Sequence, residues 1–507
     1  MRIHDGSGRV VQERKSATML LENATLISVD RGRALRRGQQ VLIQDGVITA
    51  IGKQVRSSAA DNRERFDCAG KLVIPGLVNA HSHLLEILQR SFRDNVRKEV
   101  WIRQRQMTEE GARLTENEIG AAAALACAEM LKSGVTAVVD HFSLRSGITA
   151  PKMIAVLGAF QRTGIRGVLA PSLRDQNFLD LLNSRRSNRN RAQGAGGDPW
   201  QAEMLPVLEY LRNTSTPSSL MLGPSSPQNC SDALLRAVVR TAERYDLGIH
   251  THLLETVIEH WGGRRLYRSG IVHRMKKLGL LSSRLSVAHG VWLDDREMDM
   301  LAASGASVVH NPASNLKLGS GIARIAELKK RGVNVALGTD GGDTSDSYSI
   351  FEQMRLAAFL SRIGKVAPDR WVTAADAFKM ATFGGANAIP AWREKIGSIS
   401  TGYRADLVIL TPQLRLQPLN DAIHQLVFCE TGQSVDTVLV DGKVVVRDGR
   451  LTGVDERALI NAVAPLSKNM FRIYSRIDTR RDGAEASVER LYRIAAGRSG
   501  GRAGLAR

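Results

Sequence analysis

A repeating strand–helix pattern occupies the middle of this 507-residue chain. Eight short apolar segments, several of them rich in valine, are separated for the most part by helix-like stretches. The predicted strands cover residues 76–81, 135–142, 165–171, 219–224, 247–252, 285–289, 306–310 and 333–340. Eight strands that alternate with helices are typical of a (β/α)8 TIM barrel, which is an α/β fold. The chain is long enough for one such barrel and a smaller companion domain.

Two β-hairpins are predicted near opposite ends of the chain. Asp45-Gly46 and Asp441-Gly442 each stand between two short apolar runs, and such dipeptides are a strong hairpin signal. We therefore predict a small composite β-sandwich made from N- and C-terminal segments. The predicted segments are an N-terminal extension at 1–18, sandwich parts at 19–75 and 396–455, the barrel at 76–395, and a C-terminal helix with a basic tail at 456–507.

Two stretches outside this plan have distinct patterns. Residues 183–198 are rich in Arg, Asn and Gly and predict a flexible insert without a regular element. A helical pattern covers residues 455–477, and the Gly-, Arg- and Ala-rich residues that follow are expected to be frayed.

The formal net charge of +19, from 70 basic and 51 acidic residues, raises the question of a nucleic-acid partner. The chain has no zinc-finger spacing, no aromatic RNA-binding strand and no basic heptad region, so we interpret the excess as a solvated basic surface. Its longest apolar run is about half of the ~20 residues that a membrane span needs, and its start lacks an apolar signal segment. The four cysteines form no CxxC pair. We expect a cytoplasmic protein with reduced thiols and no membrane partner.

Polar residues with metal-binding side chains follow several of the predicted strands. His81 and His83 end the first strand, and the i, i+2 spacing puts both imidazoles on one face. His250 and His252 end the fifth strand in the same way, and Glu255 follows three residues later. Each motif alone also fits a structural role, such as a polar rim or a helix-starting carboxylate.

Two more strand ends complete the pattern. His289 ends the sixth strand and Asp340 ends the eighth, so all of these groups open onto one face of the predicted barrel. Imidazole and carboxylate are the ligands of a divalent ion such as zinc or iron. A catalytic metal leaves one position open for water and lowers the pKa of that water. Glu255 is placed to move a proton to a leaving nitrogen.

Five strings in the chain are similar to motifs of the amidohydrolase superfamily, most of all its ATZ/TRZ branch. They are IPGLVNAHSH at 74–83, HTHLLE at 250–255, AHG at 288–290, HNPASNLKLGSG at 310–321 and GTDG at 338–341. That branch includes S-adenosylhomocysteine/methylthioadenosine deaminases, s-triazine chlorohydrolases and relatives of guanine deaminase. The resemblance covers about residues 19–455 and implies a barrel with a composite β-sandwich.

The resemblance also implies roles for individual residues. One divalent ion, with zinc expected and iron as the alternative, would be bound by His81, His83, His252 and Asp340. Asp340 would also accept the proton of the attacking water, Glu255 would relay protons to the leaving group, and His289 would hydrogen-bond the metal-bound water or the tetrahedral centre of the substrate. We find no strand-end lysine suited to a binuclear site.

Candidate substrate residues rest on weaker parts of the resemblance. Glu99 and Trp101 are similar in position to a ribose-hydroxyl acceptor and a stacking wall, although a surface Glu and a core Trp fit equally well. Arg174 stands where relatives place an anion-binding arginine. Ser225 replaces a histidine that touches the purine in relatives, which argues against a plain adenosine-type substrate. His141, after the second strand, is interpreted as structural, with a pocket role as the alternative.

A second departure from the relatives follows Asp340. The chain carries Asp343 and Asp346 there, and two carboxylates near the mouth would favour a cationic or amine-bearing substrate.

These observations predict a metal-dependent hydrolase that acts on carbon–nitrogen bonds outside peptides. Hydrolytic deamination of a nucleobase, nucleoside, pterin or triazine is the expected reaction. Hydrolysis of a cyclic amide, a urea or a chloro-heterocycle is the alternative, and a non-catalytic scaffold is a remote one. The expected partner is a small N-heterocyclic substrate, and relatives suggest a homo-oligomer.

Overall fold

The computed structural model describes residues 3–4, 10–11, 18–29, 35–55, 64–144, 147–183, 199–214, 216–364, 367–477 and 483–498. Most of the extension predicted at 1–18, residues 184–198 of the predicted insert and residues 499–507 of the predicted tail lie outside the described residues.

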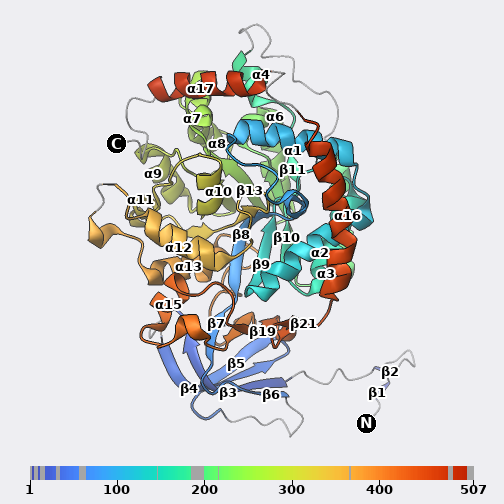
Figure 1. Ribbon diagram of the computed structural model, residues 1–507, viewed down its shortest axis with the longest axis vertical. Helices are drawn as coiled ribbons and strands as arrows, with labels where there is room; N and C mark the ends of the chain where they lie inside the picture. Colours follow the sequence, from blue (N-terminus) through green and yellow to red (C-terminus); the bar gives the residue numbers. More distant parts are fainter. Residues whose placement is uncertain are drawn as a thin grey trace.

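The predicted barrel is confirmed (Figure 1). Its strands are β8 (Leu77–His83), β9 (Val135–Asp140), β10 (Arg166–Leu169), β12 (Ser219–Pro224), β13 (Gly248–Leu253), β14 (Leu285–His289), β15 (Ser307–His310), β16 (Val335–Leu337) and β17 (Asp340–Gly341). Neighbouring strands run parallel in the order β16-β15-β14-β13-β12-β10-β9-β8-β17, with a short β11 (Ser172–Leu173) beside β12. The pairing of β17 with β8 closes the ring, because β16 and β17 are two parts of the eighth strand.

The described helices lie around and above this ring, and most of them cover its outer face (Figure 1). They are α1 (Lys98–Ala112), α2 (Glu116–Lys132), α3 (Ala150–Thr163), α4 (Phe178–Asn183), α5 (Pro199–Asn213), α6 (Asp232–Arg244), α7 (Val257–Leu266), α8 (Ile271–Lys277), α9 (Asp295–Ser304), α10 (Pro312–Lys317), α11 (Ile325–Lys330), α12 (Ile350–Leu360), α13 (Ala374–Ala381), α14 (Phe383–Asn387), α15 (Ala422–Phe428), α16 (Glu456–Tyr474) and α17 (Ala484–Arg498). Their ends follow local signals: Thr115 and Glu118 form a capping box at α2, and Gly164 ends α3 in a left-handed conformation.

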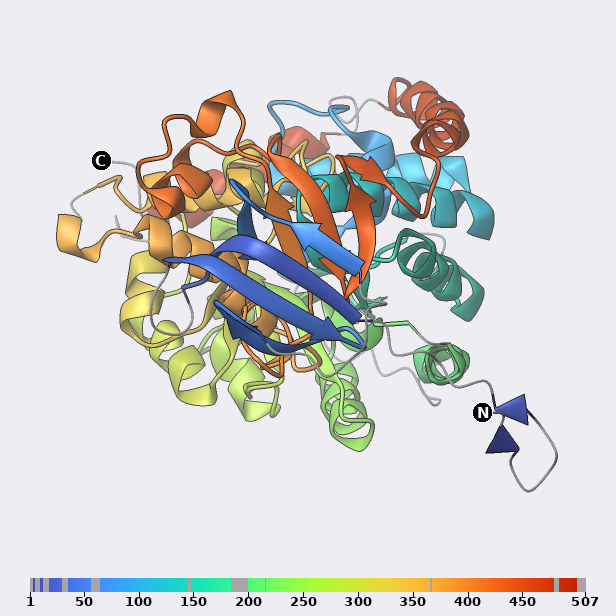
Figure 2. The same cartoon turned by 90° about the horizontal axis from the view of Figure 1, so that it is seen from below.

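A second sheet joins both ends of the chain (Figure 2). Its N-terminal strands are β3 (Thr18–Ile27), β4 (Leu35–Gln44), β5 (Val47–Gly52), β6 (Glu64–Asp67) and β7 (Leu72–Pro75). Its C-terminal strands are β18 (Leu407–Leu410), β19 (Val435–Val440), β20 (Lys443–Arg447) and β21 (Arg450–Leu451). The antiparallel pair β7–β18 joins the two groups, and Leu21, Ile43, Leu407 and Leu439 share one buried core. The antiparallel pairs β4–β5 and β19–β20 confirm both predicted hairpins.

This sheet lies at the end of the barrel opposite to the ends of its strands that carry the predicted site. β7 ends at Pro75 and β8 begins at Leu77, so the sheet leads directly into the first barrel strand. Arg166, the first residue of β10, donates to both carboxylate oxygens of Asp406, at 2.7 and 2.9 Å. It also donates to Asp441 at 3.0 Å, so this guanidinium connects the barrel to the sheet.

Replacing Arg166 by leucine is expected to lower the free energy of unfolding by about 3–5 kcal/mol, because it leaves the buried carboxylate of Asp406 without its cation. Chemical denaturation of the two proteins measures the change. Arg65→Leu is the matched control, since Arg65 pairs with Glu22 while 55% of its side chain is exposed. An unfolding midpoint that is the same in Arg166→Leu and in the unsubstituted protein would contradict the stabilising role of Arg166 between the barrel and the sheet.

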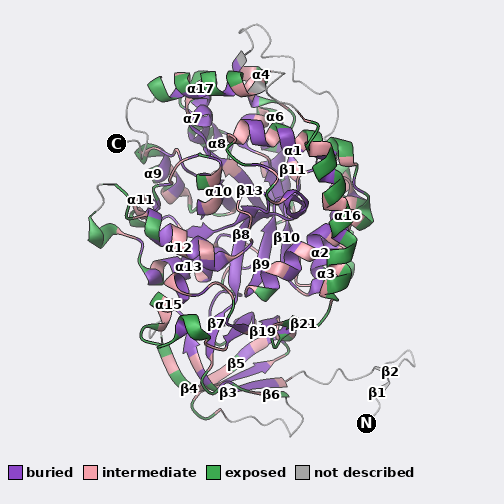
Figure 3. Cartoon of the chain, in the orientation of Figure 1, coloured by how far each residue is buried: buried purple, intermediate pink, exposed green. Residues whose placement is uncertain are grey.

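Two helices follow the second sheet at the C-terminal end. α16 confirms the helix predicted at 455–477, and it packs against α1 and α2. The expectation that the following residues are frayed is wrong for 484–498, which form α17 over α7 and α1 (Figure 1). Val488, Tyr492 and Ala495 recur at helical spacing and are buried, whereas the opposite face of α17 is exposed (Figure 3). Tertiary packing stabilises this helix.

Within the described part of the chain, no helix combines the length and the apolar character needed to cross a membrane.

Candidate metal centre and active site

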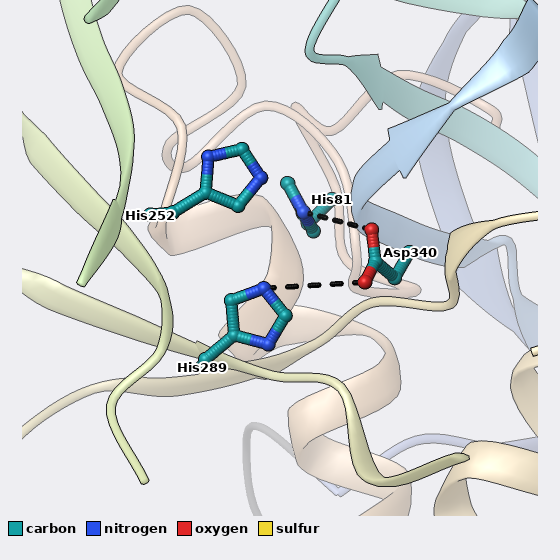
Figure 4. Close-up of side chains that lie close together, drawn as sticks. All are labelled: His81, His252, His289 and Asp340. Carbon is teal, nitrogen blue, oxygen red and sulfur yellow. Dashed lines mark ion pairs between the residues drawn. The ribbon is translucent and has the colours of Figure 1, made fainter. Parts of the chain in front are cut away.

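The predicted ligand residues meet at the C-terminal ends of the barrel strands. His81 and His83 end β8, His252 lies near the end of β13, and Asp340 begins β17. Metal-binding atoms of His81, His252, His289 and Asp340 all lie within 4.8 Å of one another (Figure 4). A second group, His83, His141 and His252, satisfies the same limit and shares His252 with the first.

Distances within this cluster suit a tetrahedral ion. Zinc bonds of about 2.1 Å to nitrogen and oxygen place tetrahedral ligand atoms about 3.4 Å apart. His83 Nε2 lies 3.2 Å from His252 Nε2 and 3.3 Å from Asp340 Oδ1. His81 Nε2 lies 3.4 Å from the same Asp340 oxygen. His289 Nε2 is farther away, at 4.0 Å from Asp340 Oδ2. His83 Nε2 thus lies closer to the Asp340 carboxylate than His289 Nε2 does, although the four-residue group within 4.8 Å contains His289 rather than His83.

The hydrogen bonds of two imidazoles indicate that a cation belongs between them. His83 Nδ1 donates to the carbonyl oxygen of His141 at 2.7 Å, and His252 Nδ1 donates to that of Ser225 at 2.6 Å. A carbonyl oxygen only accepts, so each neutral ring has its lone pair on Nε2. The two Nε2 atoms face each other at 3.2 Å, where two lone pairs repel unless a cation lies beside them. Three imidazoles and one carboxylate fit zinc or a similar divalent ion.

Electrostatics keeps these groups in the form that binds metal. Burial lowers the pKa of His81, His83 and His252, which favours neutral imidazole. Burial raises the pKa of Asp340, but contact with His81 and His83 outweighs it and holds that pKa well below its usual range. Metal binding requires neutral imidazole and ionised carboxylate.

Neighbouring residues orient these side chains. His81 Nδ1 lies 2.8 Å from His250 Nε2, and His250 Nδ1 lies 2.7 Å from Ser286 Oγ, so His250 contacts His81 rather than the centre of the cluster. Ser314 donates to Asp340 Oδ2 at 2.6 Å. Such contacts fix the orientation of metal ligands.

The backbone at the site is unusual. His289 and Asp340 have positive φ angles of 74° and 63°, a left-handed conformation that costs a residue other than glycine about 1–3 kcal/mol. Gly338 precedes this bend, and a Cβ there would lie 2.5 Å from Asn311 Oδ1 and 2.8 Å from His81 Cβ. Glycine at position 338 therefore allows the eighth strand to approach His81 closely, and the bend that follows turns Asp340 toward the cluster.

His289 and Glu255 lie beside the cluster. His289 Nδ1 donates to Asn315 Oδ1 at 2.8 Å, and its Nε2 lies 3.6 Å from Glu255 Oε2. This Nε2 is buried and has no hydrogen-bond partner among the described residues. Glu255 is buried, and its backbone N–H donates to Glu259 Oε2 at 2.7 Å. A carboxylate and an imidazole next to a metal cluster are suited to proton transfer and to hydrogen bonding of a reacting group.

A pocket opens onto this cluster. Trp101, Arg174 and Ser225 line it together with His83, His141, His252, Glu255, His289 and Asp340. His141 thus lines the pocket, and its carbonyl oxygen also accepts a hydrogen bond from His83. The residue therefore has both the structural contact and the pocket position considered from the sequence. Arg174 is exposed at this pocket and Trp101 is buried in its wall.

Glu99 is not among the residues that line this pocket. Its carboxylate accepts hydrogen bonds from Thr256 at 2.9 Å and from Tyr492 of α17 at 3.1 Å. The structure therefore brings Trp101, Arg174 and Ser225 together around the cluster and leaves Glu99 behind it.

The expected position of Asp343 and Asp346 at the mouth of the site is wrong, because neither residue lines the pocket. Asp343 is fully buried, where it binds Arg93 at 3.1 Å and accepts from Trp101 at 3.0 Å. Asp346 pairs with Lys317 and accepts from the backbone N–H of Ser91. Both charges are therefore balanced within the protein, a pairing that the local sequence does not reveal.

Sequence reasoning missed several residues around the site. Ser314 and Asn315 lie in the string at 310–321, so a signal for them existed within the resemblance. Lys98, whose Nζ lies 2.9 Å from Glu255 Oε2, had no such signal, because α1 and the segment after β13 are far apart in the chain.

Comparisons with known proteins agree with the fold and the site. A model of the amidohydrolase family matches residues 72–445. The chain is 31% identical to the 5'-deoxyadenosine deaminase of Methanosarcina mazei over 446 residues, which cover 88% of this chain and 96% of that protein. It is 33% identical to the 5-methylthioadenosine/S-adenosylhomocysteine deaminase of Pyrococcus furiosus, over 87% of this chain and 98% of that protein.

Among solved structures, an adenosine deaminase from Xanthomonas campestris with bound zinc superposes with a TM-score of 0.79 and 27% identity, over 90% of this chain and 98% of that one. The atrazine chlorohydrolase of Arthrobacter aurescens shares the fold, with a TM-score of 0.78 and 24% identity over 89% of this chain and all of that one (100%). The family match and these relatives confirm the resemblance found in the sequence motifs: the chain is a member of the amidohydrolase family.

Proposed function

We propose that this protein is a metal-dependent hydrolase that deaminates a small N-heterocyclic compound, exchanging an amino group for hydroxyl and releasing ammonia. The observation that carries the proposal is the pair of imidazole lone pairs that face each other at 3.2 Å, with Glu255 beside them. The deaminase activities named for the relatives support the same reaction.

The proposed ligands are His81, His83, His252 and Asp340. We propose one zinc ion per chain, which the zinc in the adenosine deaminase neighbour supports, with iron as the alternative. Bound there, a divalent ion would supply a Lewis acid that lowers the pKa of water toward neutrality.

Glu255 would carry the proton that the reaction has to move. Water must lose a proton as its oxygen bonds to the ring carbon, and the amino nitrogen must gain one before its bond to that carbon breaks. As the sequence motifs imply, Asp340 would accept the proton of the attacking water, and the Glu255 carboxylate would relay a proton to the nitrogen, so that ammonia leaves. His289 Nε2, 3.6 Å from the Glu255 carboxylate, would hydrogen-bond the oxygen that adds to the ring.

Residues of the pocket wall would select the substrate. Trp101 would give an aromatic surface for a flat ring, and Arg174 would attract an anionic substituent at the mouth. Ser225 is shorter than the histidine of relatives and leaves room beside the ring. From the sequence, we further propose that the protein is a cytoplasmic homo-oligomer and does not bind nucleic acid.

The test is to purify the protein, quantify bound metal, and measure ammonia release from aminated purines, pyrimidines, pterins and triazines. About one divalent ion per chain together with ammonia from one class of compound would support deamination. Metal without ammonia, but with ring opening or chloride release, would assign the alternative reaction. Protein without metal and without turnover would overturn the proposal.

A further inference from the structure

The first turn of α1 lies against the segment that carries Glu255. Lys98, the first residue of α1, places its Nζ 2.9 Å from Glu255 Oε2 and also pairs with Glu259 Oε1. The Lys98 side chain is 14% exposed, and those of Glu255 and Glu259 are 3% and 5% exposed. This ion pair is therefore largely removed from water, where charges interact more strongly than at the surface. Lys98 also lines the pocket.

Resting on the proposed function, we propose that Lys98 is a positioning residue that holds the carboxylate of Glu255 toward the reacting centre. Lys98 and Glu259 act on Glu255 from two directions. Glu259 accepts the backbone N–H of Glu255 through Oε2 and binds Lys98 through Oε1. The backbone and the side chain of Glu255 are thus fixed by one Lys–Glu pair, and Glu255 Oε2 faces His289 Nε2.

The position of Lys98 is itself fixed from outside the barrel. Glu99, the next residue, accepts hydrogen bonds from Thr256 and from Tyr492 of α17. Arg97, the preceding residue, pairs with Glu489 at 3.0 Å, and its guanidinium lies 4.4 Å from the centre of the Tyr492 ring. These contacts with α17 therefore hold the first turn of α1 in place beside Glu255.

Charge explains why a lysine suits this place. Burial alone would lower the pKa of Lys98, but the carboxylates of Glu255 and Glu259 hold it well above its usual value, so the ammonium keeps its charge. Without Lys98, Glu255 would lie beside Glu259 with no cation between them, and like charges repel at this range. We expect the Glu255 side chain then to turn away from His289.

A double-mutant cycle with Glu255 tests this role. Lys98→Met is expected to lower kcat by about 10- to 100-fold, as changes beside catalytic groups do, with KM and bound metal little changed. Lys98→Arg should recover part of the loss, because it keeps the charge. In a Glu255→Gln background, Lys98→Met should change kcat by less than about twofold, since the group that it positions is already lost. Lys132→Met, at an exposed ion pair with Glu456, is the matched control and should keep full activity.

Two kinetic results would overturn the proposal. The first is a Lys98→Met protein with the kcat of the wild type. The second is an equal fold-loss of kcat from Lys98→Met in the wild-type and Glu255→Gln backgrounds, because a general structural defect would lower kcat by the same factor in both. Should Lys98→Met not fold, Lys98→Gln, with a polar head, enters the same cycle.

A crystal structure of the metal-loaded Lys98→Met protein separates this proposal from the proposed function. It reports the position of the Glu255 carboxylate whether or not any compound in the panel reacts. A displaced carboxylate would support the positioning role, and an unmoved one would overturn it. Absence of ammonia from the unsubstituted protein would overturn the proposed deamination and leave this structural result unaffected.

Discussion

Replacing Glu255 by glutamine is expected to lower kcat for ammonia release by about two to four orders of magnitude, the usual contribution of a general acid–base residue. Glutamine keeps the size of the side chain, but its amide cannot take up a proton and pass it to the leaving nitrogen. The proposed ligands are unchanged, so the metal content should equal that of the unsubstituted protein. Steady-state ammonia assays and metal analysis on one preparation measure both quantities.

Two comparisons give this result its meaning. Glu456→Gln changes an exposed carboxylate that pairs with Lys132, and it should leave kcat unchanged. A chloro-substituted analogue of the substrate should be less sensitive to Glu255→Gln, because chloride leaves without a proton. Ammonia release at the wild-type rate in Glu255→Gln would assign the proton transfer to another residue.

Replacing Asp340 by asparagine is expected to abolish turnover through loss of the metal. Asp340 is the one carboxylate of the proposed ligand set, and its Oδ1 lies 3.4 Å from His81 Nε2 and 3.3 Å from His83 Nε2. A neutral amide removes the negative charge that three neutral imidazoles do not supply. The loss of metal affinity should exceed the about 10- to 100-fold that a change beside the ligands causes.

Metal analysis after dialysis against a chelator measures this loss. Asp346→Asn is the matched control, because Asp346 pairs with Lys317 rather than with the cluster, and it should retain the metal. Asp340→Asn protein that still holds one ion per chain would remove Asp340 from the proposed ligand set. A circular-dichroism spectrum of Asp340→Asn equal to that of the unsubstituted protein would show that the variant loses metal without unfolding.

Local patterns in the sequence predicted the architecture. Barrel strands such as β9 (VTAVVD) and β16 (VAL) are fully buried and largely apolar because helices cover one side of them and the barrel interior the other, and this makes them recognisable without knowledge of their partner strands. The hairpins at Asp45-Gly46 and Asp441-Gly442 depend on turn residues that directly join the paired strands. Closeness in sequence made these elements predictable.

The candidate cluster was also predictable from the sequence, because the barrel brings the ends of separate strands together at one site. The ends of parallel strands share one rim, so His83, His252 and Asp340 could be expected to meet without knowledge of their distances. Side-chain direction was less accessible: His250, one strand pleat before His252, contacts His81 and Ser286 instead of the centre.

The sequence by itself therefore determined the barrel, the two hairpins and which strand ends carry metal-binding side chains, since each depends on periodicity or spacing within a few residues. Only the tertiary structure decided which distant charges meet. Glu99 accepts from Tyr492, 393 residues away, and Arg93 binds Asp343 across 250 residues. The same packing turned residues 484–498 into a helix and placed Lys98 on Glu255. No local preference encodes such contacts, because they form only when the folded chain brings remote segments together and excludes water from between them.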